Sequence, residues 1–212
     1  MSKNASGADN QQGSCLDKIE INPSETTRRA PDFRKVIMAY FFGAIHDGTF
    51  SSNGRFRISQ KGDDWLKVLR EFLKQIGFSS WIYKEGKTRD VYVLETLAKF
   101  LDFQFNPENL KTQEEKTAYV RGFFDAEGGI PHNKKHRFYI QLTQKDKAKI
   151  EKIKFILDVL GIKTGKIHNP SYKVDPNYWR IYILAKSQKL FVDKVGSWHP
   201  RKINILKNRV MI

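Results

Sequence analysis

The chain contains an internal repeat, and this feature restricts its fold more than any other. Five segments recur in the same order, and the offset between copies drifts only where loops differ in length. The matches are Ala39-Tyr40 with Ala118-Tyr119, residues 57–61 (RISQK) with 141–145 (QLTQK) at offset 84, Gly77 with Gly161 at the same offset, and residues 91–94 and 99–101 with 181–184 and 189–191 at offset 90. A unit used twice predicts a pseudo-twofold body of two similar halves.

Apolar periodicity predicts the same order of elements, α-β-β-α-β-β-α, in each copy. In the first copy we expect a helix capped by Asp32 and running to about His46, strands ending with 55–61, a helix over 63–76, strands near 80–84 and 88–94, and a short final helix. In the second copy, Thr112 and Glu115 have the spacing of a capping box, which predicts a helix start. The expected fold class is therefore α+β, in two pseudo-symmetric halves.

Composition and turn signals divide the chain into four segments. Residues 1–30 have four basic and four acidic residues and no aromatic residue, which predicts a disordered leader. We expect the first half at 31–105, a linker at 106–112 beginning with Asn106-Pro107, and the second half at 113–212. With both halves in one chain, the protein is expected to be a monomer with an internal pseudo-dimer.

The charge of the chain is strongly positive and unevenly distributed. The formal net charge is +15; residues 33–105 contribute 12 basic and eight acidic side chains, and residues 106–212 contribute 22 and ten. This excess favours a polyanionic partner, nucleic acid before an anionic membrane surface, although a basic protein without such a partner remains an alternative. No apolar run approaches the length of a membrane helix and no signal peptide is evident, so an intracellular protein is expected.

Three predicted strands carry long polar side chains on one face, because side chains alternate faces along a strand. These positions are Arg55, Arg57, Ser59 and Lys61 in the first copy, Arg137, Tyr139, Gln141, Thr143 and Lys145 in the second, and Tyr178, Arg180 and Tyr182 near its end. An ordinary solvated sheet face is one interpretation. Arg and Gln are also the residues that pair bidentately with guanine and adenine, and with the basic charge we favour DNA binding.

The first helix of each copy has small residues on one face and an acid near its end. Gly43 and Gly122 would let the two helices approach closely. Asp47 and Glu127 each precede a glycine, Gly48 or Gly128, which suits a left-handed C-terminal cap. Two packed helices would bring two carboxylates and several free carbonyls together, a set of oxygen ligands that matches Mg²⁺.

These helices resemble the paired motifs of LAGLIDADG homing endonucleases, in the single-chain form with two motifs. The segment GFFDAEG at residues 122–128 is close to the motif, whereas residues 40–48 (YFFGAIHDG) are one residue shorter between glycine and acid. The resemblance spans about residues 33–200. It implies a saddle of two antiparallel sheets that straddles double-stranded DNA, with the motif helices at its centre.

The resemblance also implies catalytic roles. Asp47 and Glu127 would bind Mg²⁺ (or Mn²⁺), and Gln60, Lys61, Gln144 and Lys145 would surround the attacking water and the phosphate. The expected activity is metal-dependent phosphodiester hydrolysis at a long non-palindromic site. The alternatives are a maturase that binds intron RNA and a regulator that binds nucleic acid without cleaving it.

Overall fold

The computed structural model describes residues 32–210, so the predicted leader and Cys15 lie outside the described residues. The first half comprises α1 (Phe33–Ala44), the 3₁₀ turn η1 (Ile45–Asp47), β1 (Gly48–Phe50), β2 (Phe56–Lys61), α2 (Asp64–Gln75), β3 (Ser80–Lys84) and β4 (Val91–Thr96). After η2 (Pro107–Asn109), the second half comprises α3 (Gln113–Glu127), β5 (Gly128–Gly129), β6 (Gln141–Gln144), α4 (Lys147–Val159), β7 (Trp179–Tyr182), α5 (Ala185–Lys194) and α6 (Pro200–Val210).

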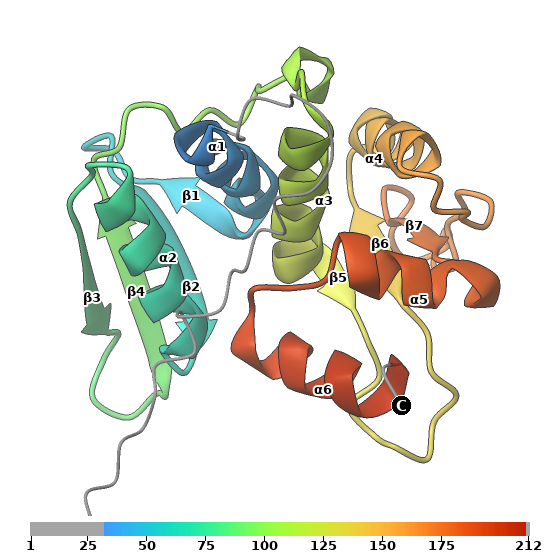
Figure 1. Cartoon of the computed structure of the whole chain (residues 1–212). Coiled ribbons are helices and arrows are strands. Elements are labelled where there is room, and N and C mark those ends of the chain that lie inside the picture. Colours follow the sequence, from blue (N-terminus) through green and yellow to red (C-terminus); the bar gives the residue numbers. More distant parts are fainter. Residues whose placement is uncertain (1–31, 211–212) are drawn as a thin grey trace, which may run out of the picture. The chain divides into compact units, whose positions relative to one another are not determined.

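Two antiparallel sheets lie on either side of a central helix pair, as Figure 1 shows. The first half supplies four strands in the order β1-β2-β4-β3, and the second supplies three in the order β5-β6-β7. The α+β class and the antiparallel pairing predicted from the sequence are confirmed. In each half, the chain passes directly from the motif helix into the first strand of its sheet.

The helix starts follow the capping signals in the sequence. The Asp32 side chain accepts a hydrogen bond from the Lys35 N–H, and the capping box of Thr112 and Glu115 opens α3. Each side chain satisfies N–H groups that the first turn of a helix leaves without partners.

The helices α1 and α3 pack at their glycines in a reciprocal way. A Cβ atom at Gly43 would lie well under 3.0 Å from the carbonyl oxygen of Tyr119, and one at Gly122 would lie equally close to that of Tyr40. Only glycine allows backbones to approach this closely. Gly43 corresponds to Gly122 in the repeat, and Tyr40 corresponds to Tyr119. Each contact is therefore the symmetric counterpart of the other, as the predicted pseudo-twofold axis requires.

One hydrophobic core connects the two halves. Buried residues from α1, α2, α3, α4 and both sheets belong to a single cluster, in which Trp65 and Phe123 are among the largest side chains. Residues 32–210 accordingly fall within one compact unit. The boundaries at 105 and 113 remain a prediction.

Two elements of the predicted repeat are absent from the described residues. The short helix expected after β4 is replaced by turns, because Asp102 accepts a hydrogen bond from the Gln104 N–H and Pro107 follows soon after. In the second half, the counterpart of β3 is reduced to two isolated bridges, Thr164 with Ile183 and His168 with Arg180.

The strand predicted for residues 137–145 is also shorter than expected, because β6 covers only Gln141–Gln144. Its partner β5 has two residues and is followed closely by Pro131, which cannot donate to a strand ladder. Arg137 and Tyr139 therefore lie in an irregular segment before β6 rather than on a regular strand.

Strand register corrects part of the repeat alignment. Gly48 pairs with Ile58 and Ile58 with Leu94; in the second half, Gly128 pairs with Leu142 and Leu142 with Ile181. Leu94 is thus equivalent to Ile181, an offset of 87, and the offset of 90 taken from sequence similarity is wrong there. Arg180 corresponds to Val93.

Candidate active site and nucleic-acid interface

The two acids of the motif helices stand at equivalent places although the first motif is one residue shorter. Helix α1 ends at Ala44 and continues as the 3₁₀ turn to Asp47, whereas α3 stays α-helical through Glu127. Three residues of 3₁₀ helix advance about 6 Å, as four residues of α-helix do. The tighter turn therefore compensates for the missing residue.

The glycines after the acids are required for a different reason from the one expected. Gly48 and Gly128 have extended backbones, with φ of −115° and −81°, so the left-handed cap predicted from the sequence is wrong at both. A Cβ atom would instead collide with the ring of Phe56 at Gly48 and with that of Phe124 at Gly128. Because these glycines have no Cβ, the backbone can pass close to an aromatic ring where the helix ends and the strand begins.

Glu127 is half-buried and Asp47 is more exposed, and the charge of Asp47 acts on Glu127. Desolvation raises the pKa of Asp47 to about 6, against the opposing effects of the Lys202 charge and a hydrogen bond from Gln60. Desolvation and then the charge of Asp47 raise the pKa of Glu127 to about 7, opposed by Lys202 and Lys145. The pair therefore disfavours two negative charges unless a cation is present.

The two predicted glutamines make different contacts. The Gln60 amide donates a hydrogen bond to the Asp47 carboxylate and so orients it. The Gln144 side-chain oxygen accepts from the N–H groups of Lys145 and Asp146. In this half the Thr143 hydroxyl donates to the main-chain carbonyl oxygen of Glu127 at 3.0 Å and leaves the carboxylate itself unbonded by this residue.

The two predicted lysines also differ. The positive charge of Lys145 contributes to the pKa of Glu127, which places its ammonium within electrostatic reach of that carboxylate. Both lysines are exposed, Lys61 at the end of β2 and Lys145 directly after β6. Gln60 thus contacts Asp47, and the charges of Asp47 and Lys145 act on Glu127, whereas within residues 32–210 neither Lys61 nor Gln144 hydrogen-bonds to these carboxylates.

Sequence reasoning missed Lys202, a buried cation at the same centre. Its side chain is 4% exposed and donates to the carbonyl oxygens of Phe124, Asp125 (3.0 Å) and Gly128 (2.7 Å). Desolvation lowers its pKa to about 8, while the charges of Asp125, Asp47 and Glu127 act in the opposite direction. No sequence signal pointed to it, because α6 lies outside the matched copies.

Asp125, inside the second motif, was also missed. It is 2% exposed and accepts hydrogen bonds from Tyr40 in α1 (2.8 Å), from the Ser197 hydroxyl and from the Trp198 N–H (2.8 Å). It thereby fastens the chain leading into α6 to both motif helices. An acid among the apolar residues of a buried helix is the signal that could have indicated this role.

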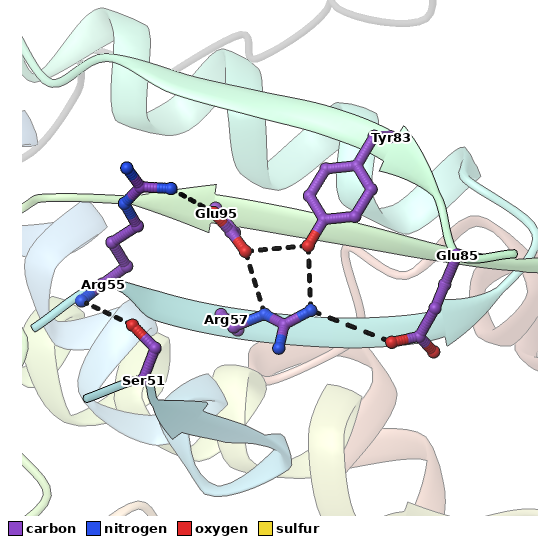
Figure 2. Close-up of polar contacts among 6 residues, drawn as sticks. All are labelled: Ser51, Arg55, Arg57, Tyr83, Glu85 and Glu95. Atoms are coloured by element: carbon purple, nitrogen blue, oxygen red, sulfur yellow. Dashed lines mark hydrogen bonds and ion pairs between the residues drawn. The ribbon is translucent and has the colours of Figure 1, made fainter. Parts of the chain in front are cut away.

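The arginines on the sheet of the first half are held by acids, as Figure 2 shows. Glu95, which is buried on β4, pairs with Arg57 at 2.9 Å and with Arg55 at 3.4 Å, and Tyr83 donates to it at 2.8 Å. Arg57 also donates to Tyr83 at 2.8 Å and lies 3.8 Å from Glu85. Much of the positive charge of this face is therefore neutralised within the protein.

The sheet of the second half keeps its charge. Arg180 on β7 donates to the hydroxyls of Tyr182 (2.8 Å) and Tyr178 (2.9 Å), and within residues 32–210 no carboxylate lies within salt-bridge distance of it. Thr143 and Gln141 lie directly opposite Arg180 and Tyr182 in the strand register. Two tyrosines thus fix a guanidinium that remains available to an anion.

The remaining predicted interface residues surround these groups. Ser59 is exposed on β2, Tyr139 packs edge-to-face on Tyr182, and Arg137 is exposed in the segment before β6. The segment before β6 is bound to α6, because Arg209 of α6 donates to the carbonyl oxygens of Asn133 and His136.

The donor set at the centre fits a divalent ion bound jointly with a second ligand. Asp47 and Glu127 supply two carboxylates, and within the described residues no group of three or more His, Cys, Asp or Glu side chains could hold a metal ion alone. The carbonyl oxygens at the end of α3 that the sequence suggested as further ligands are occupied by Lys202. Mg²⁺ usually keeps several waters and is bound by one or two carboxylates together with phosphate oxygens, which agrees with this arrangement.

The helix pair, its two acids and the flanking antiparallel sheets define a LAGLIDADG fold. Residues 114–196, which lie within the second half, match the family described as LAGLIDADG-like domain. The first half repeats its motif helix and the start of its sheet, as in the single-chain form with two motifs.

Solved structures share this fold. The homing endonuclease I-DmoI, crystallised with DNA and Mn, is 21% identical and covers 77% of this chain and 97% of its own, with a TM-score of 0.58; it has also been crystallised with DNA and Ca. Full-length DUF199/WhiA from Thermatoga maritima is 16% identical and covers 88% of this chain and 64% of its own, with a TM-score of 0.59.

A curated relative is less informative about function. The uncharacterized protein MJ0314 of Methanocaldococcus jannaschii is 23% identical over 164 residues, which is 69% of this chain. The match spans 58% of the length of that relative. Separately, no helix among residues 32–210 is long and apolar enough to cross a membrane.

Proposed function

We propose that this protein is a divalent-metal-dependent endonuclease that cleaves double-stranded DNA at a long, non-palindromic site. The observation that carries the proposal is the pair of acids, Asp47 and Glu127, set at equivalent ends of two packed helices although their motifs differ in length. A fold that needed only to bind nucleic acid gains nothing from two mutually repelling carboxylates beside phosphates.

The residues around the acids have roles that fit phosphodiester hydrolysis. A divalent ion bound by these acids would activate a water molecule and stabilise the attacking and leaving oxygens. Gln60 orients Asp47, and the Thr143 hydroxyl holds the end of α3 that carries Glu127. Lys145, whose charge acts on Glu127, would stabilise negative charge on the phosphate.

A non-cleaving role on the same scaffold is the second candidate. The WhiA proteins carry the fold under a name that specifies no nuclease, so the fold alone does not decide the activity. The neutralised arginines of the first half favour this alternative mildly, because one of the two reading faces is already engaged within the protein. A maturase that binds intron RNA is part of the same alternative.

The direct experiment is incubation of the full chain with a randomised duplex DNA library and Mg²⁺, followed by sequencing of the cut ends. We expect a recurrent asymmetric sequence at the ends, and none when the metal is chelated. Binding without cutting in Mg²⁺ or Mn²⁺ would favour the second candidate.

DNA affinity should depend steeply on salt, and the second half should contribute more of this dependence. Residues 106–212 have 22 basic and ten acidic side chains, against 12 and eight in residues 33–105. Each phosphate contact lowers the logarithm of affinity by about 0.9 per logarithmic unit of salt. Binding titrations at several salt concentrations give the slope of log affinity against log salt. Arg57→Gln should reduce this slope less than Arg180→Gln does, because Glu95 already compensates the charge of Arg57. A flat titration for the unmodified protein contradicts DNA binding through these faces.

The two halves should select different bases, because equivalent positions differ. Arg57 corresponds to Gln141, and Glu95 corresponds to Tyr182 by strand register. A bidentate pair discriminates between bases by about 1–3 kcal/mol, with arginine preferring guanine and glutamine adenine. Arg57→Gln should change base selection in one half-site only, and Gln141→Arg in the other only. Selection experiments on both variants test this; a loss of affinity with unchanged preferences would show that these side chains contact phosphate.

A further inference from the structure

Lys202 occupies the place where a cation would bind the end of α3. Its ammonium donates to three main-chain carbonyl oxygens, those of Phe124, Asp125 and Gly128, which bracket Glu127 in the sequence. The Phe124 carbonyl also accepts from the Gly128 N–H, whereas the carbonyls that follow it lie in the last turn, where a helix leaves carbonyls without internal partners and has its negative dipole end. A protonated amine at this point satisfies both the hydrogen bonds and the charge.

The lysine is held there by a dedicated set of contacts. The segment before α6 is fixed by Asp125, which bonds Ser197 and Trp198, and the ring of His199 stacks on Trp65 of the first half at 5.3 Å. Trp198 additionally lies against Arg121, whose guanidinium carbon is 4.3 Å from the ring centre. Because these contacts hold the start of α6 against both halves, a movement of Lys202 away from the end of α3 would disrupt them.

The position of the lysine has a consequence for metal binding. Lys202 forms no ion pair with Asp47 or Glu127 within 4.0 Å, but it is bound to the carbonyls on either side of Glu127, and from there its positive charge acts on both carboxylates. It also occupies carbonyl oxygens that would otherwise be ligands for a hard cation. A divalent ion approaching the empty protein meets two acids whose attraction is weakened by a fixed positive charge.

We propose that Lys202 is a positioning residue that acts as a tethered cation, so that divalent ions bind this centre tightly only when DNA supplies phosphate oxygens. This inference rests on the proposed function for its physiological meaning. The metal affinity of the protein without DNA tests it separately. The benefit would be that the metal is recruited together with the substrate rather than before it.

The test uses Mn²⁺ as the probe and calorimetric titration of the full chain. Lys202→Gln keeps an amide that can donate to the carbonyls but removes the charge, so Mn²⁺ affinity without DNA should rise about three- to ten-fold. Lys202→Arg, which keeps the charge, and Lys207→Gln, an exposed site on the same helix, should stay within about two-fold of the unmodified protein. Adding Glu127→Gln to Lys202→Gln should abolish the gain, which locates it at the acids.

A purely structural lysine would give unchanged or weaker Mn²⁺ binding in Lys202→Gln, and that result overturns the inference. If this variant does not fold, the unmodified protein still decides, because it should bind Mn²⁺ at least about ten-fold more tightly with its DNA than alone. Equal affinities would refute the proposal. Failure of the unmodified protein to cut any DNA would refute the proposed function while leaving the Lys202→Gln result interpretable.

Discussion

Glu127→Gln should abolish double-strand cleavage, lowering the rate at least about a thousand-fold, while DNA affinity changes little. The substitution removes a carboxylate ligand but keeps the size of the side chain and both sheets. Asp47→Asn should be similarly impaired, although Gln60 can still donate to the Asn oxygen, so slow nicking of one strand is expected. Strand-specific cleavage and binding assays measure these effects.

The same variant should be more stable than the unmodified protein in the absence of metal. Burial and the charge of Asp47 raise the pKa of Glu127 to about 7, so its ionised form is penalised in the folded state. This penalty is absent at low pH and grows as pH rises from the unfolded pKa, near 4.5, to the folded one. Glu127→Gln should therefore raise Tm by about 2–4 °C at pH 8 and by much less at pH 5. The control is Glu114→Gln, at the exposed start of the same helix, which should change neither the cleavage rate nor this pH dependence of Tm. If Glu127→Gln is inactive but has a lowered Tm, misfolding and not the loss of a metal ligand would explain the inactivity.

Gly122→Ala should be strongly destabilising although it adds only one methyl group. Ala normally stabilises a helix interior by about 1 kcal/mol relative to Gly. Here the added methyl meets the carbonyl oxygen of Tyr40 and the backbone of Ala44, neither of which can move without separating α1 from α3. We expect a loss of about 3 kcal/mol or more in the free energy of unfolding, measured by denaturant titration.

Two further substitutions show whether helix contact is the cause. Gly43→Ala should cost a similar amount, because its contact with Tyr119 is the symmetric counterpart. Gly165→Ala should change stability by about 0.5 kcal/mol or less, since the nearest atom to its Cβ would be 3.8 Å away. A neutral or stabilising Gly122→Ala would contradict the close packing of the motif helices.

The parts of the fold that the sequence predicted are those specified by local patterns. The capping groups Asp32 and Thr112, the small-residue faces of Gly43 and Gly122, and the alternation of β2 are all properties of short segments. The repeat then predicted that the two motif helices pack against each other, which the reciprocal contacts of Gly43 and Gly122 confirm.

The parts that were missed depend on contacts distant in sequence. Lys202 reaches the end of α3 from an element with no counterpart in the first copy, and Asp125 bonds a segment more than 70 residues away. The engagement of Arg57 by Glu95 follows from strand pairing, which periodicity within one strand does not specify. The conformation of Gly48 is determined by the ring of Phe56 rather than by the helix it follows.

Cleavage of one defined duplex tests the central claim most directly. A duplex carrying the selected sequence, labelled differently on each strand, should be cut on both strands at fixed positions near its centre when Mg²⁺ is added to the full chain. Chelation of the metal should leave the duplex bound and intact. Binding of this duplex with neither strand cut in Mg²⁺ or Mn²⁺ would contradict the endonuclease and leave a nucleic-acid-binding protein on the same fold.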